Sequence, residues 1–360
     1  MAASVGLTAV VTRTAWLPAL GLVVCGLCSL ALMLLGGDPA PAPAQALPSE
    51  PPAATDTPSG LAAYELVELL GSGSMGELWL AKHKLLGRIA ALKRIKAEVV
   101  QAEDVARFKR EARATSELTS PHTVEVYDFG DDGGVLFYAM ECLDGVDLQK
   151  LVSLDGPMPP ARAIAILVQA CHSLAEAHAL GIVHRDIKPA NLMLCRYGLD
   201  LDFVKLLDFG LAKAAQREPH ESALTRDGIV LGTAAYLAPE SLSGSAHVDG
   251  RADIYALGAV AFWLIAGRLV FEHDKPMAMV KAHLQDMPPR ASAVSRFKVP
   301  PAFDQLIADC LEKDPAKRPQ TASELAERLA DIQLDERWTK QQASSWWQAT
   351  KLAPARAQRT

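Results

Sequence analysis

Hydrophobic and polar positions divide the chain into stretches with different periodicities. Residues 16–35 are apolar almost without interruption and carry no charge, which predicts one continuous helix. Residues 37–60 are rich in proline and alanine and show no periodic apolar face, which is typical of an extended spacer. From Tyr64 onwards short apolar runs alternate with turn residues, and beyond Pro160 the apolar positions recur at helical spacing. We therefore expect a strand-rich region followed by a helical region.

The uninterrupted apolar stretch has the length of a transmembrane helix. About twenty helical residues at ~1.5 Å each span the ~30 Å hydrocarbon core of a bilayer. A signal peptide is the alternative, because Arg13 precedes the stretch and Ala44-Gln45-Ala46 offers a small-x-small cleavage site. The apolar run is longer than that of a signal peptide, and this site lies far beyond its end. We expect a membrane anchor, preceded by an N-terminal tail of residues 1–15.

The strand-rich region opens with two predicted strands, residues 64–70 and 77–81, on either side of Gly71-Ser72-Gly73-Ser74-Met75-Gly76. Glycines let a backbone approach phosphate groups and direct N–H groups at them. The same GxGxxG spacing opens dinucleotide-binding units, but there a helix follows, and an acidic residue about twenty positions later. Here strand-forming residues and then a lysine follow, so the stretch predicts a glycine-rich turn between two strands.

The other predicted elements follow from the same periodicities. Residues 124–128 and 136–140 predict a hairpin around the turn Asp131-Asp132-Gly133-Gly134. Helices are expected at residues 105–118, 161–180 and 254–266, and further strands at residues 192–194 and 204–207.

Composition and charge exclude some classes of function. The chain has 360 residues, 50% of them hydrophobic, so it can bury a substantial core. Its formal net charge of −6 gives no electrostatic support for a nucleic-acid partner. The six cysteines lack the paired spacing of a zinc site, and Cys25 and Cys28 form a CxxC only inside the apolar stretch. We expect reduced cysteines that act as small apolar residues.

One constellation carries the chemistry. His184-Arg185-Asp186-Ile187-Lys188-Pro189-Ala190-Asn191 is followed by Asp208-Phe209-Gly210 and by Ala238-Pro239-Glu240, and the glycine-rich turn precedes all three. This order and spacing resemble the eukaryotic-like (bacterial) serine/threonine protein kinases, over roughly residues 64–332. The resemblance implies an α+β, two-lobed protein kinase fold with Mg-ATP between the lobes. A mostly antiparallel β small lobe would span residues 64–143 and a helical large lobe residues 144–332, followed by a C-terminal tail, residues 333–360.

The resemblance assigns roles in the catalytic loop. Asp186 would accept the proton of the substrate hydroxyl, and Lys188 would steady the γ-phosphate. Asn191 and Asp208 would hold Mg²⁺ or Mn²⁺. Lys188, two residues after Asp186, resembles the serine/threonine class rather than the tyrosine class.

The resemblance also assigns a nucleotide site. Residues 89–93 match a strand whose lysine, Lys93, would reach the α- and β-phosphates, with Glu111 as its ionic partner. The hinge backbone at residues 141–143 would hydrogen-bond adenine, with Met140 as gatekeeper; Asp147 would meet the ribose hydroxyls or cap a helix. The expected ATP-binding residues are Leu70, Gly71, Gly73, Gly76, Leu78, Ala91, Lys93, Met140, Glu141, Leu143 and Asp147.

Residues 212–236 are polar and lack periodicity, as expected of an activation segment. Thr225 is the leading candidate phosphorylation site and Ser222 the second, because Arg185 could pair with a loop phosphate. Thr233 matches the threonine that docks peptide substrates. The resemblance implies two structural roles as well: Asp253 would brace the catalytic loop, and Arg318 would pair with Glu240.

These features predict an enzyme that phosphorylates serine or threonine in proteins, with activation by autophosphorylation between two copies in a homodimer. A catalytically inactive scaffold is disfavoured because Lys93, Glu111, Asp186, Asn191 and Asp208 are all present. A small-molecule kinase is disfavoured by the complete peptide-docking stretch, residues 232–240.

The membrane orientation rests on two opposing arguments. Arg13 precedes the apolar stretch and no Lys or Arg occurs in residues 14–81, which weakly favours an external catalytic domain. ATP, however, is present only inside the cell. We therefore expect a single-pass protein of the cell inner membrane with a cytoplasmic kinase domain.

The C-terminal tail carries Trp338, Trp346 and Trp347 near several basic residues. It is expected either to lie against a membrane surface or a partner, or to pack one tryptophan on the large lobe.

Overall fold

The computed structural model describes residues 60–73, 76–95, 102–209, 234–243 and 248–350. The chain divides into two units, Met1–Asp56 and Thr57–Thr360, and all of these residues belong to the second. The predicted membrane anchor, the N-terminal tail, the spacer up to residue 59 and the loop sites Ser222, Thr225 and Thr233 lie outside the described residues. Among the described residues, no helix is both long enough and apolar enough to span a bilayer.

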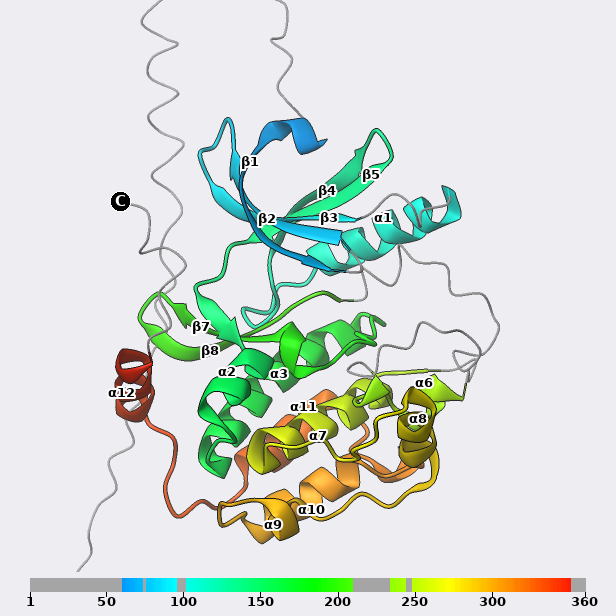
Figure 1. Ribbon diagram of the computed structural model, residues 1–360, viewed down its shortest axis with the longest axis vertical. Helices are drawn as coiled ribbons and strands as arrows, with labels where there is room; N and C mark the ends of the chain where they lie inside the picture. The colour runs from blue at the N-terminus through cyan, green and yellow to red at the C-terminus, as the bar shows by residue number, and fades with distance from the viewer. Residues whose placement is uncertain (1–59, 74–75, 96–101, 210–233, 244–247, 351–360) are drawn as a thin grey trace, which may run out of the picture. The chain divides into compact units, whose positions relative to one another are not determined.

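The small lobe is a five-stranded antiparallel sheet with one helix against it (Figure 1). Its strand order is β1-β2-β3-β5-β4, so the hairpins β1-β2 and β4-β5 flank the sheet and β3 joins them. The predicted strands and hairpin are confirmed, and the predicted helix at residues 105–118 is α1. The elements are η1 (Gly60–Ala63), β1 (Tyr64–Gly73), β2 (Gly76–His83), β3 (Ile89–Ile95), α1 (Ala102–Ser116), β4 (Val126–Asp132) and β5 (Val135–Glu141).

Strand β5 is buried on both faces. Leu136, Tyr138 and Met140 face the cluster that contains Phe108 of α1. Phe137 and the alternate residues of β5 face a second cluster under β1 and β2. Because side chains alternate along a strand, β5 divides the small-lobe core into two layers.

Gly76 is required for the close approach of β2 to β3. Its φ is +146°, and a Cβ there would lie 1.9 Å from the carbonyl oxygen of Arg94. Any side chain would therefore push the glycine-rich turn away from the sheet.

The large lobe is built around helix α7, in which every residue from Ala252 to Ile265 is buried. A helix that is apolar on all sides must be covered all round, and α3, α10 and α11 pack against α7. The sheet order is β6-β7-β8. The elements are β6 (Gly145–Asp147), α2 (Leu148–Asp155), α3 (Pro160–Ala179), η3 (Pro189–Asn191), β7 (Leu192–Tyr197), β8 (Asp200–Leu206), α6 (Pro239–Leu242), α7 (Arg251–Ala266), α8 (Pro276–Gln285), α9 (Ala291–Val294), α10 (Pro301–Cys310), η5 (Pro315–Lys317), α11 (Ala322–Ala330) and α12 (Lys340–Ala349).

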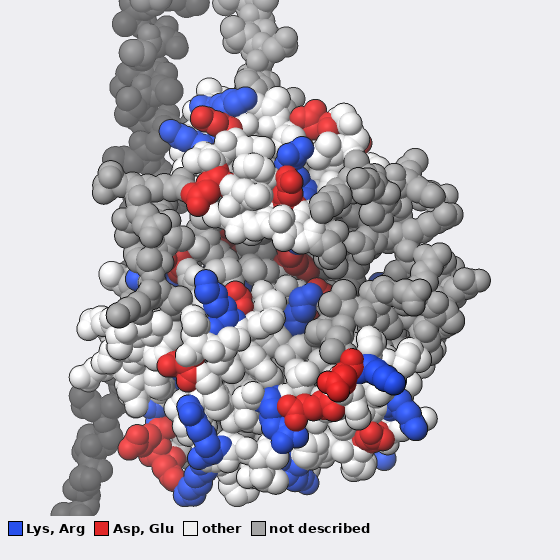
Figure 2. Space-filling view, viewed as in Figure 1, with Lys and Arg blue, Asp and Glu red and all other residues white. Residues whose placement is uncertain are grey.

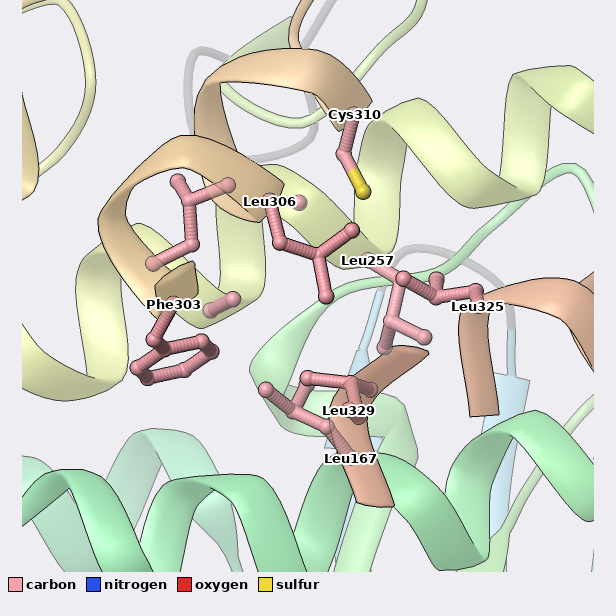
Figure 3. Close-up of a pocket in the computed structure, with 10 residues that line it drawn as sticks. Leu167, Leu257, Phe303, Leu306, Cys310, Leu325 and Leu329 are labelled. Atoms are coloured by element: carbon pink, nitrogen blue, oxygen red, sulfur yellow. The ribbon is translucent and has the colours of Figure 1, made fainter. Parts of the chain in front are cut away.

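A cavity of about 10 Å³ lies inside the large lobe between α3, α7, α10 and α11 (Figure 3). Leu167, Leu257, Phe303 and Leu329 are among its lining residues, and the lining is apolar throughout. A space of that size holds one water at most, and a water needs polar partners. We interpret the cavity as a packing defect of the core rather than a ligand site.

The tail packs on the large lobe through all three of its tryptophans. Asp202 of β8 accepts hydrogen bonds from the indole Nε1 of Trp338 and of Trp347, both at 2.8 Å. Arg162 of α3 pairs with the same carboxylate at 2.9 and 3.0 Å and lies 4.0 Å from the ring centroid of Trp346. Of the two expected arrangements, the structure shows the tail packed on the large lobe, with three tryptophans rather than one. Helix α12 lies beside β8 (Figure 1).

Replacing Trp347 by alanine is expected to destabilise the domain by about 3–5 kcal/mol, because the indole is buried and donates to Asp202. Thermal unfolding of the full chain measures this as a Tm lower by several degrees. Gln348→Ala, an exposed position on the same helix, is the control and should change Tm little. An equal Tm for Trp347→Ala and the wild type would show that the Trp347 indole adds no stability.

Candidate active site

Asp253 of α7 holds the catalytic loop through hydrogen bonds to its backbone. Its Oδ2 accepts hydrogen bonds from the backbone N–H of His184 and from Nε2 of His178, and its Oδ1 accepts one from the N–H of Arg185, all at 2.8 Å. Asp253 is buried in α7, so the loop is fixed to the helix around which the large lobe is built. Gly250 makes room for this network, since a Cβ there would lie 2.5 Å from the ring of His178.

His184 links the catalytic loop to the segment that precedes Asp208. Its Nε2 donates to the carbonyl oxygen of Leu207 at 2.7 Å, and its Nδ1 accepts from the N–H of Asp186 at 3.2 Å. Burial lowers the pKa of His184, so the ring is neutral with its proton on Nε2. One imidazole thereby links Asp186 to the residue that precedes Asp208.

Asp186 lies at the centre of the loop with two other predicted residues. The Nζ of Lys188 is 2.8 Å from its Oδ2, and the amide nitrogen of Asn191 donates to the same oxygen at 2.9 Å and to the Asp186 carbonyl oxygen at 2.8 Å. The structure thus brings the expected proton acceptor, phosphate-binding lysine and metal-binding amide to one point.

Arg185 and Asp208 have φ values of 63° and 55°, in the left-handed region that non-glycine residues rarely adopt. Such strain persists only where surrounding contacts hold it, and it is concentrated at functional sites. Arg185 directly precedes Asp186, and Asp208 follows Leu207, which His184 links to Asp186.

Lys93 forms an ion pair with Asp208, whose Oδ2 lies 2.5 Å from the lysine Nζ. Glu111 is half-buried in α1, and its pairing with Lys93 stays a prediction. The other carboxylate oxygen of Asp208, Oδ1, accepts a hydrogen bond from the hydroxyl of Tyr138 in β5. Two residues of the small lobe therefore contact the expected metal ligand of the large lobe.

The charges of this trio are set by their mutual contacts. Burial raises the pKa of Asp208. The Lys93 ammonium and the hydrogen bonds from Lys93 and Tyr138 lower it by a larger amount, so the net pKa is below that of an ordinary carboxyl. Burial lowers the pKa of Lys93, but Asp208 raises it by more. Burial raises the pKa of Tyr138, which therefore remains a donor. At neutral pH the trio is an ammonium, a carboxylate and a protonated phenol.

Apolar residues predicted to contact adenine belong to one cluster. Ala91 and Met140 are paired across β3 and β5, and Leu78 and Leu143 pack against the same cluster. Leu70, Gly71 and Gly73 are exposed at the end of β1, as expected of a turn that covers phosphates. These predicted lining residues therefore lie on adjacent strands of one sheet, except Leu143, which follows β5.

Two residues near the hinge have side-chain roles away from a nucleotide. Glu141 is buried, its side chain pairs with Lys205 at 2.6 Å, and its backbone N–H donates to the carbonyl oxygen of Glu125 at 3.0 Å. Asp147 caps α2 by accepting a hydrogen bond from the N–H of Lys150 at 2.8 Å. The helix-cap alternative is thus observed for Asp147, and its contact with ribose stays a prediction.

Arg318 and Glu240 form the expected ion pair. The two guanidinium nitrogens lie 2.6 and 2.9 Å from the two carboxylate oxygens, and the Arg318 side chain is fully buried. Arg318 also donates to the carbonyl oxygen of Arg251, at the start of α7. The pair fixes the end of the predicted peptide-docking stretch to the same helix that holds the catalytic loop.

A family model described as a protein kinase domain matches residues 64–329. The chain belongs to the protein kinase domain family. It is 37% identical over 277 residues to the serine/threonine-protein kinase pkn3 of Myxococcus xanthus, a match that covers 76% of this chain and 50% of that protein. It is 40% identical over 264 residues to PknD of Mycobacterium tuberculosis, covering 73% of this chain and 38% of that protein. The chain thus spans half or less of the length of these curated relatives.

Among solved structures, the crystal structure of the Mycobacterium tuberculosis PknI kinase domain is similar with a TM-score of 0.58 and 31% identity, over 76% of this chain and 98% of that one. The two-lobed kinase fold and the resemblance to eukaryotic-like bacterial serine/threonine kinases are therefore confirmed.

The donor atoms of this kinase domain fit a magnesium ion. Asp208 supplies a carboxylate, and Asn191 directs its amide nitrogen at Asp186, so its amide oxygen is the atom available to a cation. Mg²⁺ prefers oxygen ligands and binds through one or two protein groups together with substrate phosphates. In the described part of the chain no three His, Cys, Asp or Glu residues form a metal cluster.

Tyr138 was not predicted as a residue of the site. It lies in an apolar run, where the ring alone explains a tyrosine. Its hydroxyl could have indicated the role, because a phenol in a strand buried on both faces needs a polar partner.

Charged side chains of both signs are interspersed over the described part of the face in Figure 2. The described residues on that face therefore form no broad basic surface of the kind that binds nucleic acid.

Proposed function

We propose that this chain is a serine/threonine protein kinase that transfers the γ-phosphate of ATP to hydroxyl groups of proteins. The observation that carries the proposal is the cluster at Asp186, with Lys188 and Asn191 both on its Oδ2 at 2.8 and 2.9 Å. The names of the relatives support the same activity for the matched domain.

In the proposed reaction the substrate hydroxyl oxygen forms a bond to the γ-phosphorus as the bond to the ADP oxygen breaks. Asp186 takes the hydroxyl proton, and Lys188 turns from Asp186 to the γ-phosphate. Lys93 would hold the α- and β-phosphates. Magnesium held by Asn191 and Asp208 would neutralise phosphate charge. The residues contribute position and fixed charge, which are the main sources of acceleration in phosphoryl transfer.

We also propose that the kinase is activated by phosphorylation between two copies, at Thr225 or Ser222. A phosphate of about −2 charge would pair with Arg185, which precedes the catalytic aspartate. Mass spectrometry of the full chain after incubation with Mg-ATP is expected to find phosphate on one of these two residues. A fully active enzyme without loop phosphate would rule this activation out.

We further propose that residues 16–35 anchor the chain in the inner membrane, with the kinase domain in the cytoplasm. The length of the apolar stretch and the need for ATP support this arrangement. A cytoplasm-active reporter fused after Thr360 is expected to be active. Activity of a periplasm-active reporter at that position would reverse the orientation.

A further inference from the structure

Tyr138 is held rigidly at the boundary between the lobes. It is 1% exposed and lies opposite Lys93 in the register of β3 and β5. Its ring packs against Phe108 of α1, with ring centroids 6.3 Å apart. A tyrosine side chain has few rotatable bonds, so a sheet and a helix together fix where its hydroxyl lies.

That hydroxyl contacts Asp208 rather than a backbone carbonyl. It donates to Oδ1, while the Lys93 ammonium contacts Oδ2. Each oxygen of the carboxylate therefore has its own contact with the small lobe. Two contacts on different oxygens determine the rotation of a carboxylate about its last bond, whereas a single contact leaves that rotation open.

The two contacts differ in what nucleotide binding does to them. Lys93 is expected to turn towards the α- and β-phosphates, which loosens its hold on Oδ2. The tyrosine hydroxyl is a neutral donor fixed by packing, so its contact can persist. A carboxylate oxygen has room for a hydrogen bond and a cation together, because it offers two lone pairs.

We propose that Tyr138 is a positioning residue that holds the Asp208 carboxylate in its cation-binding orientation once Lys93 contacts the phosphates. The inference rests on the proposed role of Asp208 as a metal ligand. Carboxylates that bind metals are commonly oriented by such outer hydrogen bonds, and loss of one costs about 10–100-fold in metal affinity.

The test is Tyr138→Phe in the full chain, which deletes one oxygen and keeps the ring. Mn²⁺ binding in the presence of a non-hydrolysable ATP analogue is measured by the paramagnetic resonance signal of free Mn²⁺. The affinity for Mn²⁺ is expected to fall about tenfold or more, and the affinity for the analogue without metal to stay unchanged. In steady-state assays the Mg²⁺ concentration for half-maximal rate should rise, while kcat at saturating Mg²⁺ changes much less.

Tyr127→Phe, in the neighbouring strand β4 with Arg88 over its ring, is the matched control and should bind Mn²⁺ as the wild type does. Unchanged or tighter Mn²⁺ binding by Tyr138→Phe would overturn the inference, as would an equal loss in Tyr127→Phe. Asp208→Asn separates the metal-binding role of Asp208 from the positioning role of Tyr138. If Asp208→Asn binds Mn²⁺ as well as the wild type, the proposed metal role of Asp208 fails; if it loses binding while Tyr138→Phe does not, only the role of Tyr138 fails.

Discussion

Replacing Asp186 by asparagine is expected to slow phosphate transfer by about 10²–10⁴-fold, the range that a positioned general base contributes. Asparagine has nearly the same volume and keeps a side-chain oxygen, but it accepts no proton at neutral pH. The contacts that hold the loop come from Asp253 to backbone N–H groups and remain in the variant. The initial rate with a generic protein substrate and Mg-ATP measures the effect.

Asp335→Asn provides the control, because this carboxylate is exposed and pairs only at the surface with Lys298. Its rate should equal that of the wild type. If Asp186→Asn transfers phosphate as fast as the wild type while its circular dichroism is unchanged, the proton acceptor is another group. If wild type and variant are equally inert with the fold intact, the scaffold alternative replaces the enzyme.

Replacing Lys93 by methionine is expected to lower the rate by about 10²–10³-fold, the scale of losing one fixed charge that stabilises a transition state. Methionine fills a similar volume without the ammonium. The variant also leaves the Asp208 carboxylate, a buried anion, with Tyr138 but without its cation. Nucleotide binding and transfer rate measured together separate loss of affinity from loss of rate.

The same variant has a predicted pH dependence. Lys93 lowers the pKa of Asp208, so its removal raises that pKa, and the carboxylate then becomes protonated at a higher pH than in the wild type. The residual rate of Lys93→Met should therefore fall on acidification at a higher pH than the wild-type rate does. Lys82→Met, at an exposed position on β2, should leave both rate and pH profile unchanged. Coincident pH profiles of Lys93→Met and the wild type would show that the pair does not control Asp208.

Local patterns predicted several strands and helices, because such patterns are properties of neighbouring residues, whereas the two-lobed arrangement was implied by the family resemblance. The short apolar runs on either side of the turn Asp131–Gly134 predicted β4 and β5, and the apolar run at residues 254–266 predicted most of α7. The catalytic loop was equally legible, since Asp186, Lys188 and Asn191 lie within six consecutive positions. Their contacts are short-range in sequence and follow from the loop itself.

Contacts between distant residues were not predictable in the same way. Lys93 and Asp208 are 115 residues apart and Tyr138 and Asp208 are 70 apart, so no periodicity connects them. The contacts of the tail were also not predictable, because they join residues that are distant in the sequence. Arg162 reads as a surface charge of a helix, yet it is 2% exposed, because Asp202 pairs with it and tail indoles cover it. A buried arginine is stable only with such partners, and these partners come from two segments that are distant from α3 in the sequence, β8 and the tail.

Phosphoamino-acid analysis tests the central claim most directly. The full chain is incubated with Mg-ATP carrying a labelled γ-phosphate and a protein substrate, and the acid hydrolysate of the protein is separated. We expect label in phosphoserine or phosphothreonine, at a rate that Asp186→Asn reduces by at least about 10²-fold. Label found only in inorganic phosphate or a small molecule, or equal labelling by the wild type and Asp186→Asn, would contradict the proposed activity.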